Sequence, residues 1–186
     1  MLIETSRLLL RPFATDDVDA LHAHWTDREV RRYLWDGDKL SRARAAQLID
    51  DSLASFSARR FGFWTLRTRD DGLFVGSAGL RSIQGGSPDV ELIYSLAPSI
   101  WGRGLATEAA RAVLRYGFKV LPGPIYAGTD APNTRSVEVM RRLGMRYLHT
   151  ELSGIFGGIV WYVISREEFD PRTRYRVPKA HATNPR

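Results

Sequence analysis

Two glycines flank an arginine at residues 102–104, directly before a run of good helix formers, in the stretch SIWGRGLATEAAR (99–111). Glycine begins a helix poorly on propensity alone, so its presence here needs another reason. The N-terminus of a helix carries backbone N–H groups without partners and a partial positive charge. Glycines just before it leave those groups open to a bulky anion. The stretch therefore predicts either a cradle for a phosphate or diphosphate group, or a tight turn from a strand into a helix.

Three kinds of nucleotide-type site place glycines before a helix. A P-loop is excluded because the pattern G-x-x-x-x-G-K-[ST] is missing. The dinucleotide fingerprint G-x-G-x-x-G is matched by Gly102 and Gly104 but fails at Thr107, although Asp130 follows the next expected strand, where a ribose-binding acid belongs. That fold also requires several β-α-β units, and the sequence predicts one. A site for coenzyme A is the third possibility.

The composition excludes several classes of protein and mechanism. The chain has 186 residues, 44% of them hydrophobic and 26% charged, which is typical of one globular domain. No stretch approaches the roughly 20 apolar residues of a membrane span, and charges interrupt the opening MLIETSRLLLRPF, unlike a signal peptide. We therefore expect a cytoplasmic protein with no membrane partner. The absence of cysteine excludes acyl-cysteine intermediates, and no metal is expected because the four histidines, apart from one i, i+2 pair, lack ligand spacing.

The net charge of +6 is concentrated at the C-terminal end. Residues 171–186 carry five basic residues and no acidic one, which leaves +1 for the preceding 170 residues. A nucleic-acid-binding domain usually has its basic face on the folded part. We therefore expect one domain at 1–170, a basic and disordered tail at 171–186, and no nucleic-acid partner.

Apolar periodicity predicts the elements that position these residues. A strand is expected at 8–13, followed by helices capped by Thr15 and Ser41. A hairpin with strands at 61–69 and 73–83 around the turn 70–72 comes next, then a turn at 85–88 and a strand at 90–96. The helix after the glycines leads to the remaining elements: a strand at 125–129, a helix at 133–144 capped by Asn133, and strands at about 146–152 and 159–165.

These elements predict an α+β fold, in which helices flank a mixed, largely antiparallel sheet of six to seven strands. Short turns make neighbouring strands antiparallel, whereas the crossover through the helix after residue 104 makes 125–129 parallel to 90–96. Ligands in such sheets tend to bind where strand order or direction changes. That place is the end of strand 90–96, where the stretch that contains the two glycines begins.

Three stretches together carry a family resemblance. LIYSLAPSIWGRGLATEA (92–109) resembles motif A of the GCN5-related N-acetyltransferase (GNAT) superfamily, [RQ]-x-x-G-x-[GA], with Trp101 in place of Gln or Arg. That tryptophan is typical of the RimJ/RimL-like branch. The segment ETSRLLLRPFATDD (4–17) resembles the opening of that branch, and NTRSVEVMRRLGM (133–145) resembles its motif B. The resemblance extends from about residue 3 to 168.

The resemblance implies acetyl-CoA as the cosubstrate, bound between splayed parallel strands at 90–96 and 125–129. Backbone contacts to its pantetheine arm are implied at Tyr94, Ser95 and Leu96, with the Leu96 N–H near the thioester carbonyl, where it would stabilise an oxyanion. Asn133 would also contact the arm, or serve only as a helix cap. The diphosphate would meet the backbone amides of Trp101, Gly102, Arg103, Gly104, Leu105, Ala106 and Thr107.

The implied reaction is direct transfer to an amine, which needs a base for the amine proton and an acid for the departing thiolate. Glu91 is the candidate base, acting directly or through water; the alternatives are a solvated strand residue or an ion-pair partner. The tyrosine that usually serves as the acid in this family is replaced by Met140. The RimL-like branch instead has a serine three residues after the asparagine, so Ser136 is the candidate acid, or a serine that bonds only its own helix.

The implied activity is acetyl-CoA-dependent N-acetylation of a primary amine, either a protein N-terminus or a small molecule, by a monomer or homodimer. A protein N-terminus requires an open cleft and a small amine a closed pocket, which segments 35–44 and 152–158 would determine. Four aromatic residues are candidates for the acceptor site, although such residues more often belong to the core: Trp25, Tyr33, Trp35 and Trp161. The alternative from another class is a non-catalytic sensor that binds acyl-CoA.

Overall fold

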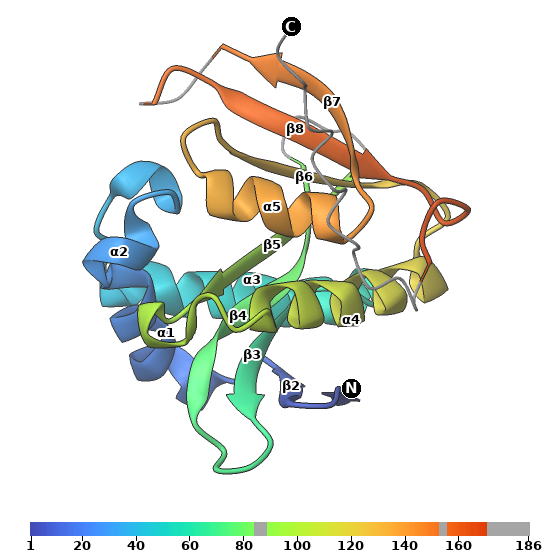
Figure 1. Ribbon diagram of the computed structural model, residues 1–186. Helices are drawn as coiled ribbons and strands as arrows, with labels where there is room; N and C mark the ends of the chain where they lie inside the picture. Colours follow the sequence, from blue (N-terminus) through green and yellow to red (C-terminus); the bar gives the residue numbers. More distant parts are fainter. Residues whose placement is uncertain (84–88, 153–155, 171–186) are drawn as a thin grey trace, which may run out of the picture.

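The computed structural model describes residues 1–83, 89–152 and 156–170, which contain one eight-stranded sheet in the order β1-β2-β3-β4-β5-β6-β8-β7 (Figure 1). The expected turn at 85–88 and the expected tail at 171–186 lie outside the described residues. The strands are β1 (Ile3–Glu4), β2 (Leu8–Pro12), β3 (Phe63–Thr68), β4 (Phe74–Ser82), β5 (Val90–Leu96), β6 (Ile125–Asp130), β7 (Arg146–Glu151) and β8 (Ile159–Ile164).

Strands β5 and β6 are the expected parallel pair, and they separate soon after they begin. Their register pairs are Val90 with Ile125 and Glu91 with Tyr126, whereas β5 continues to Leu96. The other neighbouring strands described are antiparallel. The chain between β5 and β6 passes through α4 (Leu105–Val120), and this crossover makes the two strands parallel. A gap therefore opens in the sheet where the sequence predicts the ligand.

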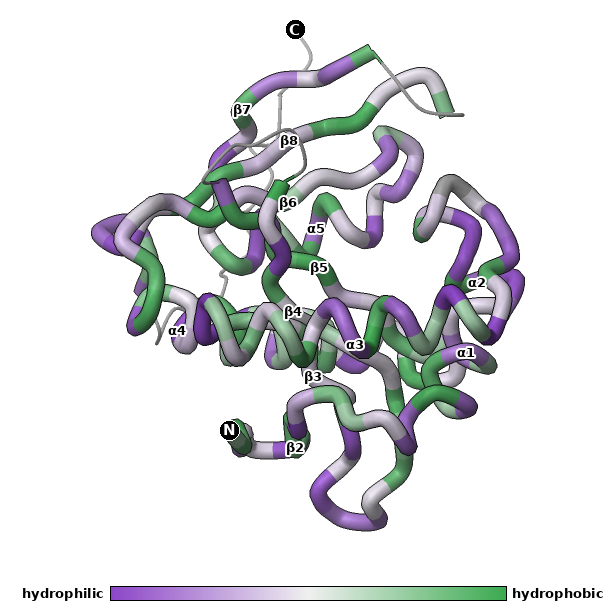
Figure 2. Tube along the Cα trace, turned by 180° about the vertical axis from the view of Figure 1, so that it is seen from behind, coloured by the Kyte–Doolittle hydropathy of each residue, from purple (hydrophilic) through white to green (hydrophobic). Residues whose placement is uncertain are grey.

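Helices cover both faces of the sheet. Helices α1 (Val18–Thr26), α2 (Arg28–Arg31) and α3 (Arg42–Arg59) precede β3 in the chain, and α5 (Thr134–Arg142) follows β6. Figures 1 and 2, seen from opposite sides, place α3 and α4 on opposite faces. No described helix is long and apolar enough to cross a membrane.

Two hydrophobic clusters hold the helices to the sheet. The larger packs α4 against the strands and contains the fully buried side chains of Leu10, Trp64, Leu66, Leu80, Val113 and Leu114. The smaller joins α1 and α3 around Phe13, Leu21, Trp25, Ala45 and Ile49. Each large apolar side chain that leaves water in this way contributes roughly 1.5–3 kcal/mol to stability, so both helix layers are held firmly against the strands.

Several local predictions are confirmed. Ser41 and Asn133 cap α3 and α5, since each side chain accepts a hydrogen bond from the backbone N–H three residues later. The β3–β4 turn at 70–72 is the hydrophilic loop at the bottom of Figure 2. Gly72 in that turn has a φ of +69°, a conformation that glycine adopts without strain.

Three details differ from the sequence predictions. The sheet has eight strands rather than six to seven, because β1 has only two residues and shows no alternation. The cap before α1 is not Thr15: the chain passes through a 3-10 turn at Thr15–Asp17 whose N-cap is Ala14. Helix α2, capped by Asp27, was not predicted, because four residues are too few for a helical period.

Candidate active site

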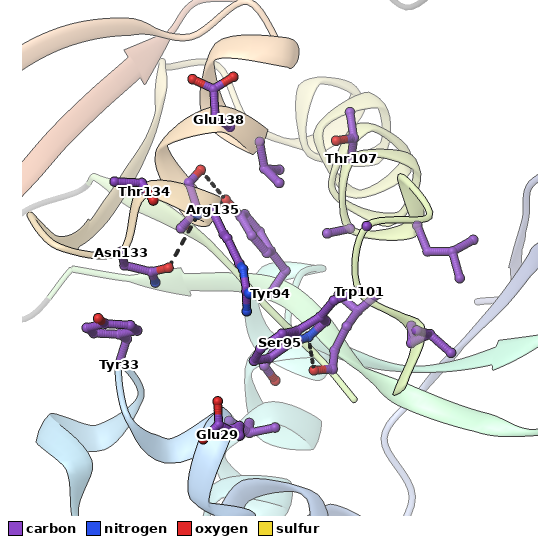
Figure 3. Close-up of a pocket in the computed structure, with 18 of the residues that line it drawn as sticks. Glu29, Tyr33, Tyr94, Ser95, Trp101, Thr107, Asn133, Thr134, Arg135 and Glu138 are labelled. Atoms are coloured by element: carbon purple, nitrogen blue, oxygen red, sulfur yellow. Dashed lines mark hydrogen bonds between the residues drawn. The ribbon is translucent and has the colours of Figure 1, made fainter. Parts of the chain in front are cut away.

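A groove of about 440 Å³ lies where β5 separates from β6, bordered by the start of α4, by α5 and by residues 29–34 (Figure 3). Of the predicted site residues, Glu91 and Arg103 are not on its walls. The groove is lined by all the others: Tyr94, Ser95, Leu96, Trp101, Gly102, Gly104, Leu105, Ala106, Thr107, Asn133 and Ser136. Residues from three parts of the sequence therefore meet at the gap in the sheet.

The two glycines before α4 adopt a backbone conformation that side chains rarely tolerate. Gly102 has a φ of +78° and Gly104, the N-cap of α4, a φ of +76°. A Cβ added at Gly102 would meet nothing within 4 Å, so the space beside it is open. The Trp101 indole N–H donates to the Leu96 carbonyl at 2.7 Å and fixes the loop to the end of β5. The glycines therefore form the expected tight turn and leave open space beside the loop, and their role as a cradle for a diphosphate stays a prediction.

The side chain of Thr107 is evidence that a polar ligand binds at the start of α4. Its Oγ1 is buried and has no hydrogen-bond partner among the described residues. An unpaired buried hydroxyl is costly, and it is rarely left so unless a ligand or water completes it. The open backbone at Gly102, the N-terminus of α4 and the Thr107 hydroxyl together fit a diphosphate group.

Arg135 crosses the groove and was not predicted. It extends from α5 to lie over the indole ring of Trp101, 4.7 Å from the ring to the guanidinium carbon (Figure 3). A cation over a tryptophan face is a favourable contact, and it holds a positive charge beside the loop that would take the diphosphate. Nothing in the spacing of residues 101 and 135 indicated this contact.

Ser136 is bonded to a tyrosine on the facing strand. The Ser136 Oγ and the Tyr94 OH are 2.9 Å apart, and the Tyr94 OH also lies 3.1 Å from the Ser136 carbonyl oxygen (Figure 3). Burial raises the pKa of Tyr94 well above its usual value, although the hydrogen bond to Ser136 opposes the shift. The phenol therefore stays protonated at neutral pH. Only the backbone of Tyr94 was predicted to matter, and alternation along β5 shows no more than that Tyr94 and Ser95 point to opposite faces.

Both polar atoms of the Asn133 side chain form hydrogen bonds within the protein. Its Oδ1 accepts from the Ser136 N–H at 3.4 Å, and its Nδ2 donates to Thr129 Oγ1 at 2.9 Å. Its role as a helix cap is thus confirmed, and its contact with a pantetheine arm stays a prediction.

Glu91 lies deep in the sheet. Its carboxylate forms an ion pair with Arg81 at 2.9 Å on the adjacent strand and accepts a longer bond from the Gly128 N–H at 3.4 Å. Burial raises the pKa of the Glu91 carboxyl, and Arg81 opposes the shift without cancelling it. A raised pKa suits a general base. Because the carboxylate is not on the wall of the groove, a direct role does not fit this geometry, and its role through water stays a prediction.

A largely buried polar network connects to the groove through Ser95. His24 Nε2 is 2.9 Å from Ser95 Oγ, which is 3.2 Å from Ser77 Oγ. The Trp25 indole N–H completes the network by donating to Ser77 Oγ at 3.4 Å. This network ties α1 to β4 and β5 directly below Leu96.

The stability of the protein should fall in acid because of His24. Burial lowers the pKa of His24 from 6.5 to about 4, so the folded protein keeps the ring neutral while the unfolded chain takes up a proton. The free energy of unfolding is therefore expected to drop by up to about 3 kcal/mol as the pH falls from 6.5 to 4. Urea denaturation at both pH values, for the wild type and for His24→Gln, checks this: the variant should lose clearly less stability over that interval. An equal loss in both proteins would contradict it.

The far end of the groove carries Glu29 and Tyr33 (Figure 3). The Tyr33 ring packs against Phe156 on the β7–β8 connection, with 5.1 Å between ring centroids. Of the four aromatic residues expected at the acceptor site, Tyr33 lines this groove, and Trp25, Trp35 and Trp161 do not. Trp25, on α1, belongs to the smaller hydrophobic cluster, and Trp35 packs against that cluster. The Tyr33–Phe156 contact joins the segment after α2 to the β7–β8 connection at the Glu29 end of the groove.

Comparison with known proteins gives a consistent result. A family model described as an acetyltransferase (GNAT) domain matches residues 7–146. An uncharacterized N-acetyltransferase, p20 of Bacillus licheniformis, is 31% identical over 146 residues, 76% of this chain and 80% of p20. A spermidine N(1)-acetyltransferase of Escherichia coli (strain K12) is 29% identical over 136 residues, 73% of this chain and 70% of that protein.

Among solved structures, the ribosomal L7/L12 α-N-protein acetyltransferase RimL in complex with coenzyme A has the same fold. It superposes with a TM-score of 0.75 at 16% sequence identity, over 88% of this chain and 97% of RimL. The matched residues 7–146 include the glycine loop, β5, β6 and α5, which form the groove. The chain therefore belongs to the GNAT family and is an acetyl-CoA-dependent N-acetyltransferase.

Proposed function

We propose that the protein transfers an acetyl group from acetyl-CoA to a primary amine by direct attack, with both substrates bound in the groove. The observation that carries the proposal is the position of the Tyr94–Ser136 hydroxyl pair and the left-handed glycine loop on one groove, at the gap between β5 and β6. The loop supplies a site for the diphosphate, and the hydroxyl pair supplies a donor near the reacting end.

The backbone is proposed to hold the coenzyme. The amides of residues 101–107 and the Thr107 hydroxyl take the diphosphate, and Arg135 contributes a positive charge beside it. The pantetheine arm lies in the gap between the strands, against β5. The Leu96 N–H then donates toward the thioester oxygen, where negative charge develops on attack.

Two proton movements complete the proposed reaction. The acceptor nitrogen loses a proton through water toward Glu91, whose pKa is raised by burial. The departing sulfur accepts a hydrogen bond from Ser136. Tyr94 donates to the Ser136 carbonyl and holds Ser136 Oγ at 2.9 Å, and the serine proton is proposed to turn from the tyrosine oxygen toward the sulfur when the thioester is bound. Ser136 is thus proposed to act as the acid, a role that a tyrosine usually has in this family and that Met140, which stands at the position of that tyrosine, cannot perform.

The acceptor is proposed to enter at the end of the groove that carries Glu29 and Tyr33. A carboxylate and an aromatic face are both groups that attract an ammonium. The relatives named above acetylate spermidine or a ribosomal protein, so the two acceptor classes are a small amine and a protein N-terminus.

The experiment that tests the function combines binding with turnover. Calorimetry with coenzyme A should show binding, and free thiol should appear when acetyl-CoA is mixed with the correct member of a panel of spermidine, other small amines and N-terminal peptides. Gly102→Ala should weaken coenzyme binding at least about tenfold, because the added methyl occupies open space meant for the ligand. Gly72→Ala is the matched control, since Gly72 has a similar φ and no neighbour within 4 Å but lies in the remote hairpin turn.

Each possible failure has a distinct meaning. Absence of coenzyme binding, or equal binding by the Gly102→Ala and Gly72→Ala variants, would contradict the proposed cradle. Binding of coenzyme A without thiol release for any amine of the panel would contradict the two proposed acceptor classes.

A further inference from the structure

The opening segment ETSR (4–7) has no part in the chemistry described so far, although it resembles the opening of its branch of the family. In the structure it lies against the first turn of α4, about a hundred residues later in the chain. Glu108 of that turn accepts hydrogen bonds from the Thr5 hydroxyl at 2.7 Å, the Ser6 hydroxyl at 2.9 Å and the Arg7 backbone N–H at 2.9 Å. We call this group, Thr5 to Arg7 with Glu108, the N-terminal clasp.

The Arg7 guanidinium joins the clasp to the glycine loop. Its Nε and Nη2 contact Glu108 Oε2 at 2.7 and 2.6 Å, and its Nη1 donates to the Arg103 carbonyl at 2.9 Å. The Arg103 carbonyl lies between the two glycines, so this one bond fixes the orientation of the peptide in the middle of the loop. Arg7 Nη2 is also the nearest atom to a Cβ built on Gly104, at 3.8 Å.

The clasp neutralises a negative charge, that of Glu108, at the end of α4 where the anion is proposed to bind. An acid in the first turn favours helix formation, but here it would repel an anion bound at the same helix end. Burial raises the pKa of Glu108, and the hydrogen bonds from Thr5, Arg7 and Ser6 outweigh it and bring the pKa below its usual value. The carboxylate is therefore charged and needs a cation beside it. Arg7 supplies that cation, which leaves the N–H groups of α4 free to attract the ligand.

We infer that Arg7 is a positioning residue for the coenzyme diphosphate, acting through the Arg103 carbonyl and Glu108; this inference rests on the proposed binding of acetyl-CoA. Three of the five N–H groups of the Arg7 guanidinium bind Glu108 and the Arg103 carbonyl, so its bonds in the structure support a positioning role. The N-terminal segment thus holds residues 102–104 in the conformation that is proposed to bind the diphosphate.

The test compares two acetyl donors that share the reacting end. Acetyl-CoA carries the diphosphate, and S-acetylpantetheine lacks it, so a defect in the diphosphate site affects only the first. Arg7→Gln is expected to lower kcat/KM for acetyl-CoA about tenfold, since a charge-assisted bond network is lost, and to leave kcat/KM for S-acetylpantetheine unchanged. General damage to the fold would lower both.

Two further variants separate position from charge and from stability. Arg7→Lys keeps the charge beside Glu108 but cannot bridge Glu108 and Arg103 together, so it should recover at most part of the loss seen in Arg7→Gln; full activity of the lysine variant would overturn the inference. Arg11→Gln is the matched control, because Arg11 is also on the N-terminal segment and binds a buried carboxylate, Asp17, at 2.6 Å. It should change the melting temperature without changing the ratio between donors.

The outcomes distinguish this inference from the proposed function. If the wild type binds no coenzyme A, the proposed function fails. If the wild type binds it and Arg7→Gln uses both donors as the wild type does, the clasp has no role in binding and only this inference fails.

Discussion

Ser136→Ala is expected to lower the rate of acetyl transfer about a hundredfold, which is the low end of what general acid catalysis contributes. The substitution removes the hydroxyl that is proposed to donate to the departing sulfur, and it leaves the helix cap intact because the Asn133 side chain accepts from the Ser136 backbone N–H. The affinity for coenzyme A should stay the same. Steady-state kinetics at saturating amine, together with calorimetry, measure both quantities.

The facing tyrosine provides a check on that result. Tyr94→Phe keeps the ring but removes the bond to Ser136 Oγ, so it should slow transfer to a smaller extent, and the double variant should be no slower than Ser136→Ala alone. Tyr116→Phe is the control, because the Tyr116 hydroxyl also donates to a backbone carbonyl, that of Arg60, away from the groove. Unchanged turnover in Ser136→Ala would remove this serine from the mechanism.

Gly76→Ala is expected to destabilise the fold by about 3 kcal/mol or more, because strain from a positive φ adds to overpacking. Gly76 has a φ of +143° and lies opposite Leu96 in the β4–β5 register. A Cβ there would come within 2.1 Å of the Ser95 carbonyl oxygen, and neither backbone can retreat without moving the strand. Denaturant unfolding of the purified variant measures the loss.

The same substitution also affects the reaction in whatever protein remains folded. A displaced β5 moves the Leu96 N–H from the expected thioester position, so residual folded protein should transfer acetyl groups slowly. Gly72→Ala, with open space around its Cβ, should lose only the cost of its positive φ. Equal stability of the two variants would show that β5 yields more easily than its packing suggests.

Much of the fold was predictable because its signals are local. Alternation identified the long strands, Ser41 and Asn133 marked helix starts, and a helix between two strands required a parallel pair. The place of the groove followed from the same reasoning, since it lies where β5 parts from its parallel neighbour and the glycine loop comes shortly after that strand. Two short elements escaped, β1 and α2, because they hold too few residues to show a period.

The contacts within the site were less predictable, because they depend on register between distant segments. The Tyr94–Ser136 bond spans 42 residues, and the bonds to Glu108 span about a hundred. Glu91 shows the same limit: the sequence left open whether it is a base or an ion-pair partner, and only the β4–β5 register places Arg81 beside it. The sequence predicts that Glu91 lies on a strand, but it does not predict that Arg81 is its ion-pair partner.

The parting of β5 and β6 has a consequence for how long the protein survives. The two halves of the sheet share only two register pairs, so they meet at a narrow seam. If the proposed function is correct, acetyl-CoA lies in the gap in the place of a strand and connects the two halves of the sheet. By mass action, acetyl-CoA at a hundred times its dissociation constant adds about 2.7 kcal/mol to the resistance against unfolding. The lifetime of the folded enzyme would then increase with the concentration of acetyl-CoA.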